Sequence, residues 1–145
     1  MQLQIDTAQL QDAPQLANLL EQLGYPASVQ QVADRIVAHQ AAGYRLLVAK
    51  EGSYALGFIS LHFYQAMHHT QCIGRITAFC VDESIRGTGT GSQLLTAAEK
   101  YFQSNNCIKV EVTSNLKRNM THQFYLKRGY CEVSKHFIKL LSPKR

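Results

Sequence analysis

The sequence lacks any apolar run of the roughly 18 residues that a membrane-spanning helix requires. Residues 1–6 have neither the basic nor the apolar region of a secretory signal peptide. The cysteines form no C-x-x-C pair and are interpreted as ordinary thiols of a reducing compartment: Cys72, Cys80, Cys107 and Cys131. These absences predict a cytoplasmic protein with no membrane partner.

Charged residues are also scarce, at 17% of the chain, whereas apolar residues reach 46%. This balance excludes a disordered tail protein, and the length suits a single domain over residues 1–145. The net formal charge of +5 favours an anionic ligand. Nucleic acid is not expected as a partner, because basic and aromatic residues do not interleave as they do on a base-stacking surface.

Hydrophobic periodicity and turn residues predict elements in the order β-α-α-β-β-β-α-β-α-β. The strands are expected at 3–7, 45–50, 55–63, 73–82 and 109–113 and within 132–141, and the helices at 12–24, 28–43, 94–103 and 119–127. Asp12 is expected to cap the first helix, and Ser28 with Gln31 to form a capping box on the second.

The centre of the sequence is a glycine-rich segment, residues 86–91 (RGTGTG), between a predicted strand and a predicted helix. Glycines allow positive φ angles and let a ligand approach backbone N–H groups. The helix start adds unpaired N–H groups and the positive end of its dipole. Arg86 and the hydroxyls of Thr88, Thr90 and Ser92 are expected to supplement this site. The segment predicts a pyrophosphate cradle, the alternative being a tight strand-to-helix connection without a ligand.

Two common phosphate motifs do not fit this segment. A P-loop ends in Gly-Lys-Ser/Thr, but Gly91 is followed by Ser92 and Gln93; a dinucleotide fingerprint reads G-x-G-x-x-G, but the spacing here is G-x-G-x-G. The Arg-x-x-Gly-x-Gly pattern of residues 86–91 instead resembles the acetyl-coenzyme A signature of the GCN5-related N-acetyltransferases (GNAT). Residues 124–130 (FYLKRGY) are similar to a later motif of the same family.

The resemblance implies an α/β (α+β) fold with a mixed, mostly antiparallel sheet, a splayed strand pair and about four flanking helices. It implies acetyl-CoA as cosubstrate and direct acetyl transfer to an amine in a ternary complex. The residues implied to bind acetyl-CoA are Phe79, Cys80, Val81, Arg86, Gly87, Thr88, Gly89, Thr90, Gly91, Ser92, Asn115, Arg118 and Tyr125. Arg118 and Thr121 depart from the Asn and Ala of the wider family.

Catalytic roles follow from the same resemblance. It places Tyr125 beside the thioester sulfur, where a phenol can protonate the departing thiolate; the alternative is that Tyr125 only packs. A backbone N–H near Phe79 or Cys80 is expected to stabilise the oxyanion. Edge strands near the C-terminus are compatible with a homodimer.

Within the family the chain is most similar to the aminoalkylphosphonate N-acetyltransferases, through residues 61–62 (LH), 68–69 (HH) and 113–115 (TSN). Those relatives carry strand glutamates where this chain has Arg75 and Ala78, so the general base is open. The adjacent His68 and His69 are the catalytic candidates, because imidazole titrates near the working pH. The other bases in reach are His62, His122, Glu111 and Asp82.

The expected acceptor is a small-molecule amine that is anionic or neutral overall, bound by Arg75, His62 and Glu111. No metal is expected, because no carboxylate or cysteine stands at ligand spacing beside the histidines. Peptide, protein and aminoglycoside acetylation are alternatives within the class. A non-catalytic sensor that binds acyl-CoA is the alternative outside it.

Overall fold

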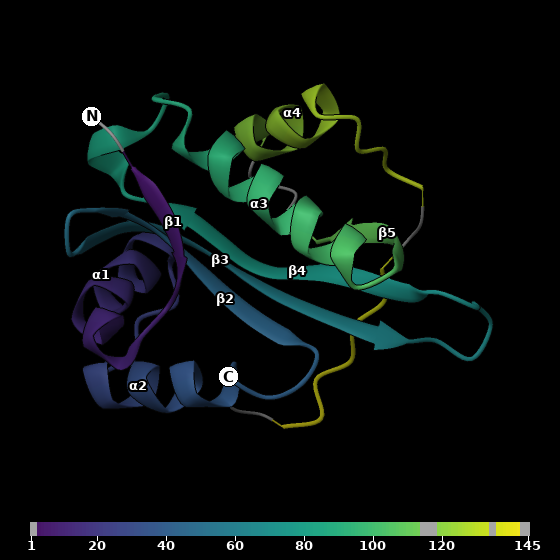
Figure 1. Cartoon of the computed structure of the whole chain (residues 1–145), viewed down its shortest axis with the longest axis horizontal. Helices are drawn as coiled ribbons and strands as arrows, with labels where there is room; N and C mark the ends of the chain where they lie inside the picture. Colours follow the sequence, from purple (N-terminus) through teal and green to yellow (C-terminus); the bar gives the residue numbers. More distant parts are fainter. Residues whose placement is uncertain (1–2, 114–118, 134–135, 143–145) are drawn as a thin grey trace. The chain divides into compact units, whose positions relative to one another are not determined.

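The structure is a computed structural model of the chain and describes residues 3–113, 119–133 and 136–142. It forms two compact units, Met1–Thr113 and Ser114–Arg145. The first unit contains a sheet and its helices (Figure 1): β1 (Gln4–Thr7), η1 (Leu10–Asp12), α1 (Ala13–Leu23), α2 (Val29–Ala38), β2 (Tyr44–Glu51), β3 (Tyr54–Gln65), β4 (Cys72–Val81), η2 (Glu83–Ile85), α3 (Thr90–Ser104) and β5 (Cys107–Val112). The second unit contains α4 (Asn119–Lys127). No helix in the described ranges has both the length and the apolar character needed to cross a membrane.

The sheet has five strands in the order β1-β2-β3-β4-β5. Neighbouring strands are antiparallel except β4 and β5, which run parallel and are connected through α3. A parallel pair needs a crossover of this length, whereas β2 and β3 need only the turn at Gly52, whose φ is +61°. The mixed, mostly antiparallel sheet predicted from the sequence is therefore confirmed.

The paired part of β4 and β5 is short. Their register ends at Ile76↔Val112, although β4 continues to Val81 alongside β3. The register between β3 and β4 shifts at the same place, so that Ser60 lies opposite Ala78 and the register passes over Thr77. A bulge bends its strand and ends regular pairing. The pairing of β4 with β5 thus ends just before Thr77, and the expected splay of the pair stays a prediction.

Helices cover both faces of the sheet. Phe58 and Cys80 pack against α1 and α2 in a cluster that also contains Leu16 and Ile36. The adjacent positions on these strands face α3 instead, because side chains alternate along a strand. Gly74 on that face lies so close to α3 that an added Cβ would stand 2.6 Å from the Phe102 ring.

The helix ends follow the predicted signals with one correction. Ser28 and Gln31 form the expected reciprocal capping box on α2, with bonds of 2.9 and 3.1 Å. Asp12 precedes α1 but caps none of its N–H groups. Its carboxylate accepts from the Gln9 N–H at 2.8 Å and pairs with Lys50 Nζ at 2.9 Å. Both charged side chains are buried, so Asp12 neutralises Lys50 under α1 rather than starting the helix.

The last expected strand, within 132–141, is wrong for the residues that can be described there. Residues 131–133 and 136–142 form no strand, and their large apolar side chains, such as Val133 and Phe137, are exposed. The prediction used apolar content, but Phe137-Ile138 and Leu140-Leu141 are adjacent pairs and do not alternate. Strand propensity depends on a neighbouring strand, which local composition cannot supply.

Candidate active site

The glycine segment connects the end of β4 to the start of α3. Gly87 and Gly89 have φ angles of +85° and +92°, in the left-handed region that favours glycine. A Cβ added at either position would meet nothing within 4 Å, so the space beside both glycines is open. Gly89 precedes α3, and no side chain caps the first turn of this fully described helix. The first N–H groups of α3 and the helix dipole give this helix start the local conformation that anion sites use. Its role as a pyrophosphate cradle stays a prediction.

Side chains of the segment brace the turn. Thr88 Oγ1 donates to the Ile85 carbonyl at 2.6 Å and lies 3.0 Å from Thr90 Oγ1, and Thr90 is buried. Arg86 Nε donates to the Val81 carbonyl at 3.1 Å and so ties the segment back to β4. The two threonine hydroxyls therefore help to hold the shape of the turn, and their expected contacts with a ligand stay a prediction.

The backbone of β4 turns its hydrogen-bonding groups alternately to the two sides. The Asp82 N–H donates to the Leu56 carbonyl of the β3 side at 2.8 Å. Alternation then directs the backbone of Cys80 towards β3 and that of Phe79 and Val81 to the opposite side. Of the two residues predicted to supply an oxyanion donor, Phe79 thus faces the side on which β5 has ended. The Cys80 thiol is buried and donates to the Leu19 carbonyl of α1 at 3.4 Å.

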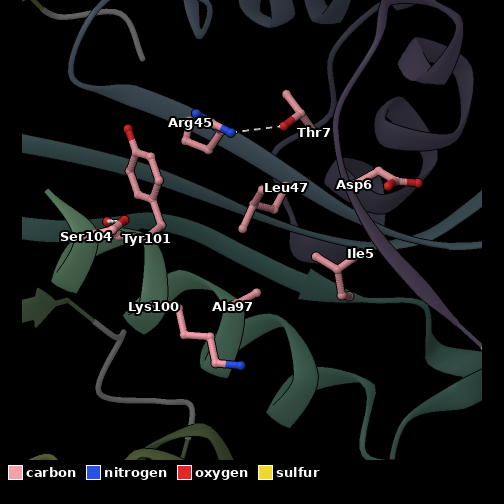
Figure 2. Close-up of a pocket in the computed structure, with 9 residues that line it drawn as sticks. All are labelled: Ile5, Asp6, Thr7, Arg45, Leu47, Ala97, Lys100, Tyr101 and Ser104. Atoms are coloured by element: carbon pink, nitrogen blue, oxygen red, sulfur yellow. Dashed lines mark hydrogen bonds between the residues drawn. The ribbon is translucent and has the colours of Figure 1, made fainter.

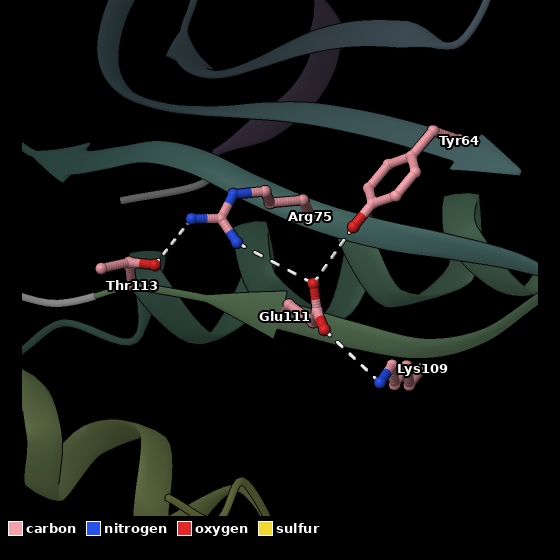
Figure 3. A network of polar contacts seen from close by, with 5 residues as sticks. All are labelled: Tyr64, Arg75, Lys109, Glu111 and Thr113. Atoms are coloured by element: carbon pink, nitrogen blue, oxygen red, sulfur yellow. Dashed lines mark hydrogen bonds and ion pairs between the residues drawn. The ribbon is translucent and has the colours of Figure 1, made fainter. Parts of the chain in front are cut away.

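A charged network occupies the sheet where β4 and β5 are still paired (Figure 3). Arg75 and Glu111 are register partners, with Arg75 Nη1 3.9 Å from Glu111 Oε1. Arg75 Nη2 donates to Thr113 Oγ1 at 2.7 Å. Glu111 Oε1 also accepts a hydrogen bond from the Tyr64 hydroxyl at 3.4 Å, and Glu111 Oε2 forms an ion pair with Lys109 Nζ at 3.4 Å. Two cations and one carboxylate leave this network with a net formal charge of one positive unit.

Stacked aromatic rings extend from the network across β3 and β2. His62 stacks on Tyr64 with centroids 5.7 Å apart and on Tyr44 with centroids 4.2 Å apart. Tyr44 in turn meets His39, the residue that ends α2, edge-on at 5.6 Å. His62, Arg75 and Glu111, the predicted substrate-binding residues, are thus joined through Tyr64 on one face of the sheet.

The predicted catalytic histidines lie far from the glycine segment. His68 and His69 occupy the turn before Cys72, with ring centroids 4.4 Å apart. That turn and the glycine segment are at opposite ends of β4, and the nine steps between Cys72 and Val81 span roughly 30 Å. The structure does not bring the two histidines to the cradle.

The second unit holds the remaining predicted residues. Tyr125 in α4 is 7% exposed, and its ring meets Phe124 edge-on at 5.6 Å and Tyr130 at 5.5 Å. Asn115 and Arg118 lie outside the described residues. The catalytic role of Tyr125 stays a prediction.

Sequence reasoning missed Tyr44, Tyr64 and Lys109. Each stands in a predicted strand or at its edge, and Tyr64 and His62 are two residues apart, a spacing that places them on one face. The shared face of Tyr64 and His62 could therefore be predicted from the alternation. The contact of Tyr64 with Glu111 was not, because it depends on the pairing of strands 47 residues apart in sequence.

Residues 13–130 match the sequence profile of the Acetyltransferase (GNAT) family. An aminoalkylphosphonate N-acetyltransferase of Salmonella typhimurium (strain LT2) is 38% identical over 98 residues, which cover 68% of this chain and 62% of that protein. The chain therefore matches less than two thirds of that relative.

Solved structures share the fold. An acetyltransferase of Trypanosoma brucei superposes with a TM-score of 0.83 at 24% identity, over 97% of this chain and 100% of the other. The structure of AAC(6')-Iy in complex with the bisubstrate analog CoA-S-monomethyl-acetylneamine has a TM-score of 0.83 at 14% identity, over 98% of this chain and 99% of that one. At these sequence identities, the similarity to the two solved structures shows a shared fold and nothing further.

Proposed function

The chain belongs to the acetyltransferase (GNAT) family, an acyltransferase family whose acetyl donor is acetyl-CoA, and from this we propose that it N-acetylates a small primary amine. The observation that carries the proposal is the open turn of Gly87 and Gly89 at the uncapped start of α3. Its N–H groups fit the pyrophosphate of coenzyme A. Bound acetyl-CoA supplies the acetyl group as an activated thioester.

The network of Arg75, Lys109 and Glu111 is proposed as the acceptor site. It lies at the point where β5 ends beside β4, and its net positive charge favours an acceptor with an anionic group. Arginine binds phosphonate or carboxylate through two parallel hydrogen bonds. The name of the Salmonella relative, an aminoalkylphosphonate N-acetyltransferase, supports the same substrate class.

An amine attacks a thioester only after it loses a proton. Glu111 and His62 share the face of the sheet on which we place the acceptor, whereas His68 and His69 lie in the turn between β3 and β4. We therefore assign the orientation of the amine to Glu111, with its proton passing to Glu111 or His62. Tyr125 is proposed to protonate the departing thiolate, and the Phe79 N–H to stabilise the oxyanion.

Release of coenzyme A thiol with a panel of amines tests this function. We expect kcat/KM for aminomethylphosphonate to exceed that for spermidine by at least about tenfold, or 1.4 kcal/mol. Arg75→Gln should reduce that preference, whereas Arg35→Gln, an exposed arginine on α2, should leave it unchanged. Equal kcat/KM values for the two amines contradict the anionic acceptor. Tight acetyl-CoA binding with no turnover for any amine indicates a sensor instead.

A further inference from the structure

A groove separate from the candidate active site runs between the first two strands and α3 (Figure 2). Its volume is about 610 Å³, within the range of small-molecule sites. The groove is lined by Ile5, Asp6, Thr7, Arg45, Leu47, Ala97, Lys100, Tyr101 and Ser104. All of these residues belong to the first compact unit.

The groove and the charged network lie on opposite faces of the sheet. Arg45 pairs with Leu61, and Leu61 pairs with Ile76, so these three residues share one face. His62 follows Leu61 on β3, and its partner Arg75 precedes Ile76 on β4. Adjacent positions on a strand face opposite sides. Along α3, Lys100 is ten residues beyond Thr90, about 15 Å from the glycine turn. A ligand in the groove would therefore touch neither site.

Arg45 and Lys100 are the cationic side chains that line the groove. Ile5 and Thr7 pair with Ala49 and Leu47, so these four residues share the face that α3 covers. Asp6 pairs with Val48, whose side chain lies in the opposite core, and Figure 2 shows the Asp6 carboxylate pointing away from Arg45. Among the described lining residues, Arg45 and Lys100 are the cations; Figure 2 shows Lys100 Nζ pointing away from Arg45, so Arg45 alone holds its charge over the hollow.

The Arg45 guanidinium is held in place before any ligand arrives. Its Nη1 donates to Thr7 Oγ1 at 3.2 Å, and its Cζ lies 4.9 Å from the centroid of the Tyr101 ring. Burial raises the pKa of the Tyr101 phenol, although Arg45 opposes the shift, so the ring does not neutralise Arg45 near neutral pH. A fixed guanidinium loses less entropy on binding than a mobile one.

We propose that this groove binds a small organic anion. The carboxylate or phosphate of the ligand contacts Arg45, and the exposed Lys100 side chain turns towards it on binding. The apolar part of the ligand lies over Leu47 and Ala97. Arginine beside a lysine supplies charge-assisted hydrogen bonds to such a group. An apolar body distinguishes this ligand from an inorganic ion.

Amide NMR titration of the full chain with phenyl phosphate tests the site, and inorganic phosphate and benzylamine serve as comparison ligands. Phenyl phosphate should shift the Leu47 and Ala97 amides saturably, and its affinity should exceed that of inorganic phosphate and of benzylamine. Lys100→Gln and Arg45→Gln should each weaken it by at least about tenfold. Arg35→Gln removes the same charge from α2 and should leave the affinity unchanged.

Three results overturn the proposal: shifts confined to residues 86–92, equal weakening by Arg35→Gln, or tighter binding of benzylamine than of phenyl phosphate. Lys100 is exposed, so its variant tests the charge even where Arg45→Gln fails to fold. The groove residues are not part of the proposed acetyl-CoA or acceptor sites, so thiol release by Lys100→Gln should equal that of the wild type.

Discussion

The side-chain amide of Gln22, near the end of α1, holds Asp82 at the end of β4. Gln22 Nε2 donates to Asp82 Oδ2 at 3.2 Å, and Gln22 Oε1 accepts from the Glu83 N–H at 3.0 Å. Gln22 and Asp82 are 60 positions apart in the sequence, and their contact fixes where the chain leaves the sheet and enters the glycine turn. The helix that carries the core on one face also braces the entrance to the proposed cofactor cradle.

This contact predicts that Gln22→Ala weakens acetyl-CoA binding by about three- to tenfold, because a loosened turn must be ordered on binding. Calorimetry measures the affinity. Gln30→Ala is the control, since Gln30 also donates to a carboxylate, that of Asp34, but in an exposed contact within α2. Unchanged affinity in Gln22→Ala, or an equal loss in Gln30→Ala, contradicts the role.

The cradle itself is tested at Gly89. Valine there meets a φ of +92° and adds branched carbons to the open side of the turn, so acetyl-CoA affinity should fall more than about tenfold. Asparagine tolerates positive φ and should cost less affinity than valine.

A control at Gly24 separates the effect of backbone strain from the effect on binding. Gly24 ends α1 with a φ of +100° and has open space around it. Gly24→Val should lower the melting temperature and leave acetyl-CoA affinity intact. A folded Gly89→Val protein with wild-type affinity would remove these residues from the cofactor site.

Gly74 should resist substitution for a different reason. Its missing side chain makes room for Phe102, which is 1% exposed and cannot turn away. Gly74→Ala should therefore lower the free energy of unfolding by about 1–3 kcal/mol through overpacking. Urea unfolding measures it. Gly74→Ala combined with Phe102→Leu should cost less than the two single changes added together, and strict additivity contradicts the contact.

The sequence was informative where signals are local. The Ser28 and Gln31 capping box, the glycine stop at Gly24 and the strand, turn and helix around Gly89 each depend on a few neighbouring residues. These signals gave the element order through α4 correctly. They predicted the turn at the proposed cradle because glycine is the residue that most readily adopts positive φ.

Long-range pairing limited the rest. Asp12 has the composition of a helix cap, but its partner Lys50 is 38 residues away and becomes visible only when β2 lies under α1. The bulge at Thr77 depends on the register with β3, and the Tyr64 contact with Glu111 on the order of three strands. Alternation in the sequence predicts which residues share a face of the sheet, but the pairing of the strands determines which of these residues are in contact.

We expect Asp82 to contribute to the pH dependence of the free energy of unfolding in acid. The Ser84 hydroxyl and the Ser84 N–H donate to its carboxylate at 2.6 and 2.9 Å and hold its pKa below the usual value, while partial burial opposes them. A lowered folded-state pKa gives stability that is fully present above the unfolded pKa of about 4 and is lost as pH falls through the folded pKa. Asp82→Asn removes that contribution.

The difference in unfolding free energy between wild type and Asp82→Asn should therefore be largest near neutral pH and vanish in strong acid. Urea unfolding across that range measures it. Asp34→Asn on the exposed side of α2 is the control. A difference that grows as the pH falls has the wrong sign and contradicts the assignment.

Tyr125 is the final prediction, and it concerns the chemical step. A thiolate leaves more readily when a proton meets it, and general acids contribute roughly 10²–10⁴ in rate. Tyr125→Phe keeps the ring and its contacts with Phe124 and Tyr130 but removes the hydroxyl. We expect kcat to fall at least about a hundredfold while acetyl-CoA affinity changes little, the pattern of an interaction made mainly in the transition state.

Tyr130→Phe is the matched control, because it removes a hydroxyl from the ring beside Tyr125 and should leave kcat near the wild-type value. The rates must be measured where chemistry limits turnover, which single-turnover mixing establishes. Wild-type kcat in a folded Tyr125→Phe enzyme would assign the proton to water or to His122, which stands three residues earlier in α4. An equal loss in both variants would indicate instead that packing of the tyrosine pair, rather than proton donation, sustains the rate.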